Sequence, residues 1–138
     1  MKVIADTGPL VALFDAGDEF HAWAMASLGG IREPLLTSEA VLSEALFLLA
    51  PLKKSRAAFL EFWMEGGLVV SFNAEAQKSA LAALMKKYQD LPMSLADASI
   101  IRMSELFTDA PVWSLDRHFS IYRRLGRKSI PLLDWPRG

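Results

Sequence analysis

The sequence predicts an α/β fold in which a mostly parallel five-stranded sheet carries helices on both faces, in a single domain over residues 1–138. Short β-rich runs alternate with longer stretches of helical spacing, which is typical of a parallel sheet with helical crossovers. The length is that of one domain, and 52% apolar residues are enough to form a core. No repeat, low-complexity segment or linker divides the chain.

The predicted strands are five short apolar runs bounded by turn-forming residues. They are residues 3–5, 35–37, 68–72, 111–115 and 130–133. Ligands of parallel sheets bind just beyond the carboxyl ends of the strands. The residues that follow each strand are therefore the first candidates for a functional site.

The predicted helices connect these strands and begin or end at proline, glycine or capping residues. Pro9 stands in the first turn of the first helix, Pro51 ends the third, and glycine pairs follow the second and the fourth. The predicted helices are residues 10–14, 19–28, 38–50, 55–65, 74–88, 94–107 and 119–125.

Composition excludes several classes of protein. The chain has no cysteine, which excludes disulfides, thiolate metal sites, iron–sulfur clusters and thiol nucleophiles. No apolar run approaches the ~18 residues of a transmembrane helix, and the longest, residues 45–52, contains Pro51. Asp6 interrupts the N-terminal apolar run before a signal-peptide core forms. We expect a soluble, cytoplasmic protein that does not bind a membrane.

Two predicted strands end in aspartate: Asp6 follows the first, and Asp116 follows the fourth. If these strands are parallel neighbours, both carboxylates lie at one rim of the sheet. Ser114 lies two residues before Asp116, so both side chains point the same way on a strand, and the hydroxyl can bind a carboxylate, a water or a phosphate oxygen. The structural alternative is that each aspartate caps a helix or forms a turn, and that the hydroxyl is satisfied within the fold.

Two further acids fall on predicted helices, at positions whose spacing indicates a buried face. Glu44 lies in helical register with Val41 and Leu48, and an ionised carboxylate there is costly without a cation or hydrogen-bond donors. Asp97 precedes two isoleucines by three and four residues. Ser94 and Asp97 also fit a capping box, in which the acid binds the backbone at the start of its own helix.

Converging carboxylates repel one another, and a fold tolerates them chiefly when a cation neutralises them. Oxygen ligands, in a chain with no cysteine and two histidines, predict a hard divalent ion, Mg²⁺ or Mn²⁺. Such an ion activates water for attack on phosphorus and stabilises the leaving oxygen. We predict metal ligation by Asp6, Asp97 and Asp116, with Glu44 completing the catalytic set.

The segments that carry these acids are Asp6-Thr7-Gly8 and residues 37–44, 95–101 and 114–119. Their order and spacing resemble the four acidic motifs of PIN-domain ribonucleases. The resemblance implies a PIN-like three-layer sandwich, Mg²⁺- or Mn²⁺-dependent hydrolysis of RNA, and Thr7 as a supporting residue. A small chain of this length resembles the VapC-like toxins of toxin–antitoxin pairs, which implies a homodimer that is inhibited by an antitoxin protein.

The sequence departs from the common pattern of that family at two positions. Ser114 stands where threonine is usual. His118 stands where many toxin members carry a further acid, one that would serve a second metal ion. His118 is interpreted as a surface residue that caps the next helix or, alternatively, as a contact to the scissile phosphate or a proton donor.

Charge and hydropathy indicate further surfaces. Residues 1–52 hold two basic and seven acidic side chains, whereas residues 53–138 hold thirteen basic and nine acidic ones. Arg117, Arg123 and Arg124 are predicted to bind RNA phosphates; the alternative is a solvated helix face with cations at its C-terminus. The apolar faces of residues 47–52 and 59–63 exceed what one small sheet covers, which indicates self-association.

The predicted function is that of a metal-dependent endoribonuclease, a hydrolase that acts as the toxin of a toxin–antitoxin pair. The main alternative is a catalytically silent PIN-fold module that binds RNA or a protein partner. A third hypothesis is an aspartyl phosphotransfer enzyme or response receiver. Gly8 disfavours the enzyme, because a phosphatase of that kind has a second acid at this place, and residues 132–135 disfavour the receiver, because they lack the lysine that follows its last strand.

Overall fold

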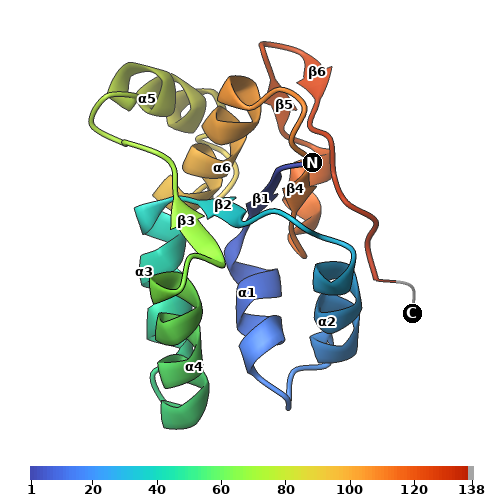
Figure 1. Cartoon of the computed structure of the whole chain (residues 1–138). Coiled ribbons are helices and arrows are strands. Elements are labelled where there is room, and N and C mark those ends of the chain that lie inside the picture. The colour runs from blue at the N-terminus through green and yellow to red at the C-terminus, as the bar shows by residue number, and fades with distance from the viewer. Residues whose placement is uncertain (137–138) are drawn as a thin grey trace.

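The computed structural model describes residues 1–136, so residues 137–138 of the predicted domain lie outside the described part (Figure 1). Its centre is a parallel sheet of four strands in the order β3-β2-β1-β4. The strands are β1 (Val3–Ala5), β2 (Leu35–Thr37), β3 (Leu68–Val70) and β4 (Val112–Trp113). Because all four run in the same direction, their carboxyl ends meet at one rim of the sheet.

Helices connect the strands and lie on both sides of the sheet. They are α1 (Thr7–Phe14), α2 (His21–Gly29), α3 (Glu39–Leu49), α4 (Lys53–Met64), α5 (Lys78–Lys87) and α6 (Leu95–Leu106). In Figure 1, α1 to α4 lie below the sheet and α5 and α6 lie above it. Helix α5 begins four residues later than predicted, because the Asn73 side chain accepts the Ala76 N–H in a turn at 3.1 Å.

The C-terminal part of the chain differs from the prediction. The predicted fifth strand, residues 130–133, is reduced to a single parallel bridge between Leu132 and Val112. The helix predicted for residues 119–125 is instead a 3-10 helix, η1 (Arg117–Ser120), and an antiparallel hairpin of β5 (Arg123–Arg124) and β6 (Lys128–Ser129). The chain reverses at Leu125 and Gly126, whose φ angles of 52° and 87° are incompatible with a right-handed helix.

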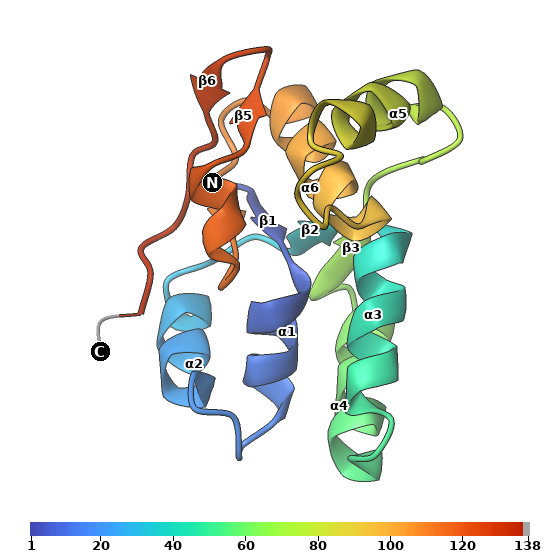
Figure 2. The ribbon, with the colours of Figure 1, turned by 180° about the vertical axis from the view of Figure 1, so that it is seen from behind.

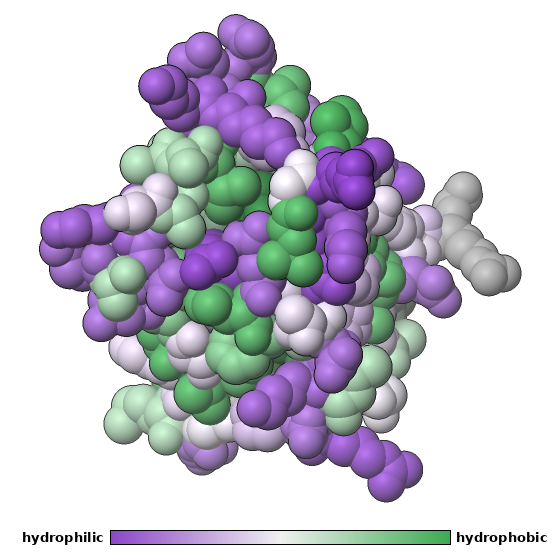
Figure 3. Space-filling model, turned by 90° about the horizontal axis from the view of Figure 1, so that it is seen from above, coloured by the Kyte–Doolittle hydropathy of each residue, from purple (hydrophilic) through white to green (hydrophobic). Residues whose placement is uncertain are grey.

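The core is built around β1, whose three residues are completely buried. A central strand of a parallel sheet is covered on both faces, so its sequence is continuously apolar. Phe14 on α1 packs edge-on against the buried Phe59 on α4, with ring centroids 5.4 Å apart. The surface over α5, α6 and the hairpin mixes polar side chains with separate apolar patches (Figure 3). Within residues 1–136, no helix has both the length and the apolar character to cross a membrane.

Candidate active site

Asp6 lies at the carboxyl end of the central strand. Its backbone N–H donates to the Trp113 carbonyl oxygen at 2.9 Å, which continues the pairing of β1 with β4. This pairing places Ser114 beside Asp6, and the Ser114 hydroxyl donates to Asp6 Oδ2 at 2.7 Å. Both side chains are buried, with Asp6 only 6% exposed. The neighbouring strands thus hold the Asp6 carboxylate in one orientation.

Asp116 is connected to Asp6 by the hydrogen bonds of Ser114. The Asp116 N–H donates to Ser114 Oγ at 3.0 Å, so one hydroxyl contacts both aspartate positions. Asp116 Oδ1 accepts the His118 backbone N–H at 2.9 Å and caps η1. The His118 ring also contacts this oxygen, with Nδ1 3.0 Å away. The prediction that His118 caps this helix is therefore wrong: Asp116 is the cap, and His118 lies within the first turn with its ring against the fourth acid.

Asp97 lies in the first turn of α6, where the predicted capping box is present. The Asp97 N–H donates to Ser94 Oγ at 3.0 Å, and the Ser94 N–H donates to Asp97 Oδ2 at 3.1 Å. The N-terminal ends of α3 and α6 lie next to one another beside the end of β1 (Figure 2). The cap therefore holds Asp97 near the carboxyl rim, and the capping and site interpretations are compatible.

Glu44 corrects the sequence prediction, because it does not lie on the buried stripe of its helix. The side chain is exposed on α3, and Leu48, predicted to share its buried face, is 56% exposed. The buried face consists of Val41, Leu42, Ala45 and Leu49. Helical spacing shows which residues share a face but not which face meets the core. Glu44 lies instead beside Phe47 and Leu48, in the lining of a shallow surface pocket.

The acids act on one another electrostatically. Burial raises the pKa of Asp6 to about 7, against the hydrogen bond from Ser114, and the charges of Asp97 and Asp116 add to the rise. The pKa of Asp97 is raised by burial and by Asp116. The pKa of Glu44 is raised by partial burial and by Asp97. In residues 1–136, the His118 ring contacts one of these acids, Asp116, and no lysine or arginine forms an ion pair with them.

The donor chemistry of this region fits a hard divalent cation. Carboxylate oxygens are the ligands that Mg²⁺ and Mn²⁺ prefer, and a cation would offset the mutual repulsion of the acids. The Thr7 hydroxyl, next to Asp6, is buried and has no hydrogen-bond partner within residues 1–136, so a polar atom is free beside the carboxylates. In the described part of the chain, however, no three acidic or histidine side chains lie close enough together to hold an ion as they stand.

The sequence of this domain matches the model of the PIN domain over residues 3–125. The chain belongs to the PIN-domain family. Its similarity to a curated relative is also extensive: it is 28% identical over 127 residues to Ribonuclease VapC26 of Mycobacterium tuberculosis, covering 90% of this chain and 94% of the relative.

Among solved structures, this PIN domain is similar to the crystal structure of Mycobacterium tuberculosis VapC20, described as a sarcin–ricin loop cleaving toxin. The TM-score is 0.75, with 21% sequence identity, and the match covers 86% of this chain and 93% of that one. This likeness confirms the predicted α/β fold with a mostly parallel sheet, in which the strand count differs by one.

The three arginines predicted to bind RNA have contacts within the PIN domain. Arg124 Nη1 donates to the carbonyl oxygens of Ser104 and Thr108, at 2.6 and 3.0 Å, and so binds the end of α6. Arg123 Nη1 donates to backbone carbonyls of residues 120–122. The exposed Arg117 lies over the Trp135 ring, 3.8 Å from its centroid. These contacts stabilise the C-terminal segment, and RNA binding by these arginines stays a prediction.

One residue of this region was missed by the sequence analysis. Tyr122 is completely buried, packs against Tyr88 and Phe119, and has no hydrogen-bond partner for its hydroxyl within residues 1–136. Burial, followed by the charges of Asp97 and Asp116, raises the pKa of Tyr122 to about 12. No sequence pattern indicated that Tyr122 is buried near the acids, because residues 119–125 were predicted to form a helix with no defined buried face.

Proposed function

We propose that this PIN domain is a divalent-metal-dependent endoribonuclease that acts in the cytoplasm as the toxin of a toxin–antitoxin pair. The observation that carries the proposal is the group formed by Asp6, Asp97 and Asp116 at the carboxyl rim. The charges of Asp97 and Asp116 add to the raised pKa of Asp6, the charge of Asp116 adds to that of Asp97, and within residues 1–136 no lysine or arginine is paired with these acids. The family match and the relative named as a ribonuclease support the same function.

Different residues would bind the metal ion and orient its ligands. Asp6, Asp97 and Asp116 would hold Mg²⁺ or Mn²⁺, and Glu44 would complete the group from the exposed face of α3. When bound, the ion supplies positive charge that offsets the carboxylates and polarises a phosphodiester. Ser114 orients Asp6 through its 2.7 Å hydrogen bond, and the capping box orients Asp97. Thr7 supports the site with its unpartnered hydroxyl.

The proposed partners are an RNA substrate, an antitoxin protein and a second copy of this chain. The VapC names of the relatives support the first two. Exposed apolar side chains on α3, α4 and their connection support self-association, because such a surface is typical of an interface. They are Phe47, Leu48, Leu52, Trp63 and Met64.

The proposal is tested by removing single carboxylates. Asp6→Asn and Asp97→Asn should each fold normally and lose RNA cleavage by about 100-fold or more, since each removes a negative oxygen ligand of the ion. Cleavage is measured with Mn²⁺ and single-stranded RNA, and circular dichroism checks the fold. The products of wild type should carry 5′-phosphate and 3′-hydroxyl ends. Asp109→Asn, on an exposed residue after α6, is the matched control.

Retained cleavage in both aspartate variants would contradict the proposal, as would 2′,3′-cyclic phosphate ends. Cyclic phosphate ends would mean that the 2′-hydroxyl of the RNA, and not a water molecule, attacks the phosphorus.

The second candidate is a PIN module that binds RNA or a protein without cleaving. It is favoured by one observation, the lack of a ready three-ligand arrangement in residues 1–136. Titration with Mn²⁺ distinguishes the two. Thermal stabilisation together with cleavage supports the nuclease, whereas neither effect at millimolar Mn²⁺ supports the silent module.

A further inference from the structure

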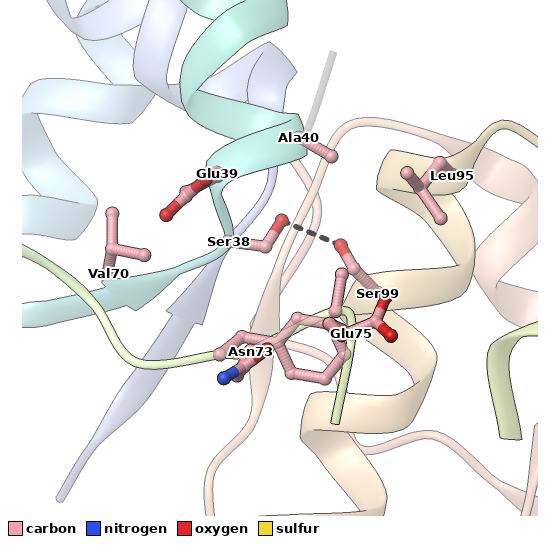
Figure 4. Close-up of a pocket in the computed structure, with 10 residues that line it drawn as sticks. Ser38, Glu39, Ala40, Val70, Asn73, Glu75, Leu95 and Ser99 are labelled. Atoms are coloured by element: carbon pink, nitrogen blue, oxygen red, sulfur yellow. Dashed lines mark hydrogen bonds between the residues drawn. The ribbon is translucent and has the colours of Figure 1, made fainter. Parts of the chain in front are cut away.

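A cavity of about 550 Å³ opens at the carboxyl ends of β2 and β3, beside the proposed catalytic group (Figure 4). Three segments form it: the start of α3, the chain after β3, and the first turns of α6. The lining residues are Ser38, Glu39, Ala40, Val70, Phe72, Asn73, Ala74, Glu75, Leu95 and Ser99. None of them has a role in the proposed cleavage.

A pair of buried serines stands between this cavity and the acids. Ser38 Oγ and Ser99 Oγ are hydrogen-bonded at 2.7 Å, and the bond joins the start of α3 to α6 (Figure 4). Ser99 lies two residues after Asp97. Ser38 follows Thr37, whose hydroxyl donates to the Ala5 carbonyl oxygen at 2.9 Å, directly before Asp6. The cavity lining is therefore close to two proposed metal ligands. Asp6 lies at the end of the neighbouring strand, and Asp97 lies two residues before Ser99 on the same helix.

The lining combines apolar walls with hydrogen-bond acceptors. Val70, Phe72 and Leu95 supply apolar surface, and Phe72 supplies an aromatic ring. Glu39 and Glu75 are exposed carboxylates, and the lining contains no lysine, arginine or histidine. Such a cavity disfavours a phosphate, which needs positive charge or N–H donors. It favours a flat, uncharged ring that carries amino groups on its edge.

Glu39 is the acceptor best placed for this role. Glu75 is bound to Lys78 at 2.7 Å, and the Asn73 carbonyl oxygen accepts a backbone N–H of its own turn. Within residues 1–136, Glu39 has neither an ion pair nor a side-chain hydrogen bond, and it lies in the first turn of α3. A carboxylate accepts hydrogen bonds from the amino group of cytosine, and an aromatic ring stacks on any base.

We infer that this cavity is a base-selecting subsite for a nucleotide next to the cleaved phosphodiester, and that it accepts a base with an exocyclic amino group: adenine, cytosine or guanine. The inference rests on the proposed nuclease function. Uracil is disfavoured, because its Watson–Crick edge has no amino group, and its one donor, the N3–H, lies between two carbonyl oxygens that repel the Glu39 carboxylate.

The test is a cleavage profile. Full-length protein with Mn²⁺ cleaves a random single-stranded RNA pool, and sequencing of the ends gives the base frequencies around the cut. Wild type should select against uracil at one flanking position by on the order of tenfold. Glu39→Gln should reduce this selection severalfold, and Ala40→Phe, which adds a ring to the cavity wall, should abolish it. Glu61→Gln, on an exposed residue of α4, is the matched control and should leave the profile unchanged.

Two outcomes overturn the inference: wild-type cleavage without selection against uracil at a flanking position, or equal selection in wild type, Glu39→Gln and Ala40→Phe. If wild type does not cleave RNA, the nuclease proposal fails, and the subsite is decided separately. Adenosine, cytidine, guanosine and uridine are then titrated into ¹⁵N-labelled wild type. Amide shifts confined to the cavity residues, with uridine the weakest ligand, support the subsite, and their absence overturns it.

Discussion

The carboxyl rim of the sheet carries two regions of different character, separated by the Ser38–Ser99 hydrogen bond. Over β1 and β4, the acids are partly or fully buried, and burial and mutual repulsion raise the pKa of Asp6 and of Asp97. Over β2 and β3, the carboxylates of Glu39 and Glu75 are exposed at the edge of a cavity with apolar walls. This difference corresponds to the two proposals made for the rim, a cation on one side and an uncharged ring on the other. Three predictions test this division.

The largest effect concerns the pH dependence of stability without metal. The pKa of Asp6 is about 7 in the fold, above the ordinary value of 3.8, so between these values the folded chain binds more protons than the unfolded chain. The contribution of Asp6 to stability is fully present below about pH 4 and is lost as the pH rises through about 7. In EDTA, the free energy of unfolding should fall by on the order of 2 to 3 kcal/mol from pH 5 to pH 8.

Urea denaturation at the two pH values measures this loss. Asp6→Asn should remove most of it, because the amide does not titrate. Glu39→Gln, on the cavity side, should behave like wild type, because its side chain is exposed. If wild type is as stable at pH 8 as at pH 5, burial does not raise the pKa of Asp6 as expected.

A smaller effect, on the rate of cleavage, is expected when the hydrogen bond from Ser114 to Asp6 is removed. The Ser114 hydroxyl donates to Asp6 and lowers its pKa, so Ser114→Ala should leave more of Asp6 protonated at neutral pH. We expect about tenfold slower cleavage at pH 7 and partial recovery at pH 9. The pH–rate profile with Mn²⁺ is the measurement, and Ser129→Ala, on an exposed residue of β6, is the control. An unshifted profile would contradict the role given to Ser114.

The smallest effect is expected at the boundary between the regions. Ser99 Oγ contacts Ser38 and also donates to the Ala96 carbonyl oxygen at 2.7 Å, so Ser99→Ala should cost about 1 kcal/mol of stability. Ser104→Ala is matched to it, because Ser104 donates to the Ile101 carbonyl on the same helix, away from the cavity lining. Only Ser99→Ala should alter base selection, and stabilisation by Mn²⁺ should stay as in wild type. A loss of Mn²⁺ stabilisation in Ser99→Ala would show that the two regions are one site.

Much of the site depends on local chemistry and is therefore predictable. Asp6 and Asp116 follow apolar runs that pair in the sheet, and the capping box of Ser94 and Asp97 forms between residues three apart. Glu44 was placed on the wrong face of its helix, because residue spacing carries no information on which side the sheet lies. The hairpin of β5 and β6 was missed, because it depends on the left-handed conformation of Leu125, a residue that rarely adopts it.

By itself, the sequence determined the order of strands and helices as far as β4, the helix caps in this part, and the placing of acids at strand ends, because these features depend on neighbours along the chain. Only the tertiary structure decided that β1 lies between β2 and β4, and this arrangement brings Ser114 to Asp6 across 108 residues and Ser38 to Ser99 across 61. It also decided how deeply each carboxylate is buried. The physical reason is that burial and electrostatic repulsion depend on distances in space, which many distant contacts set together.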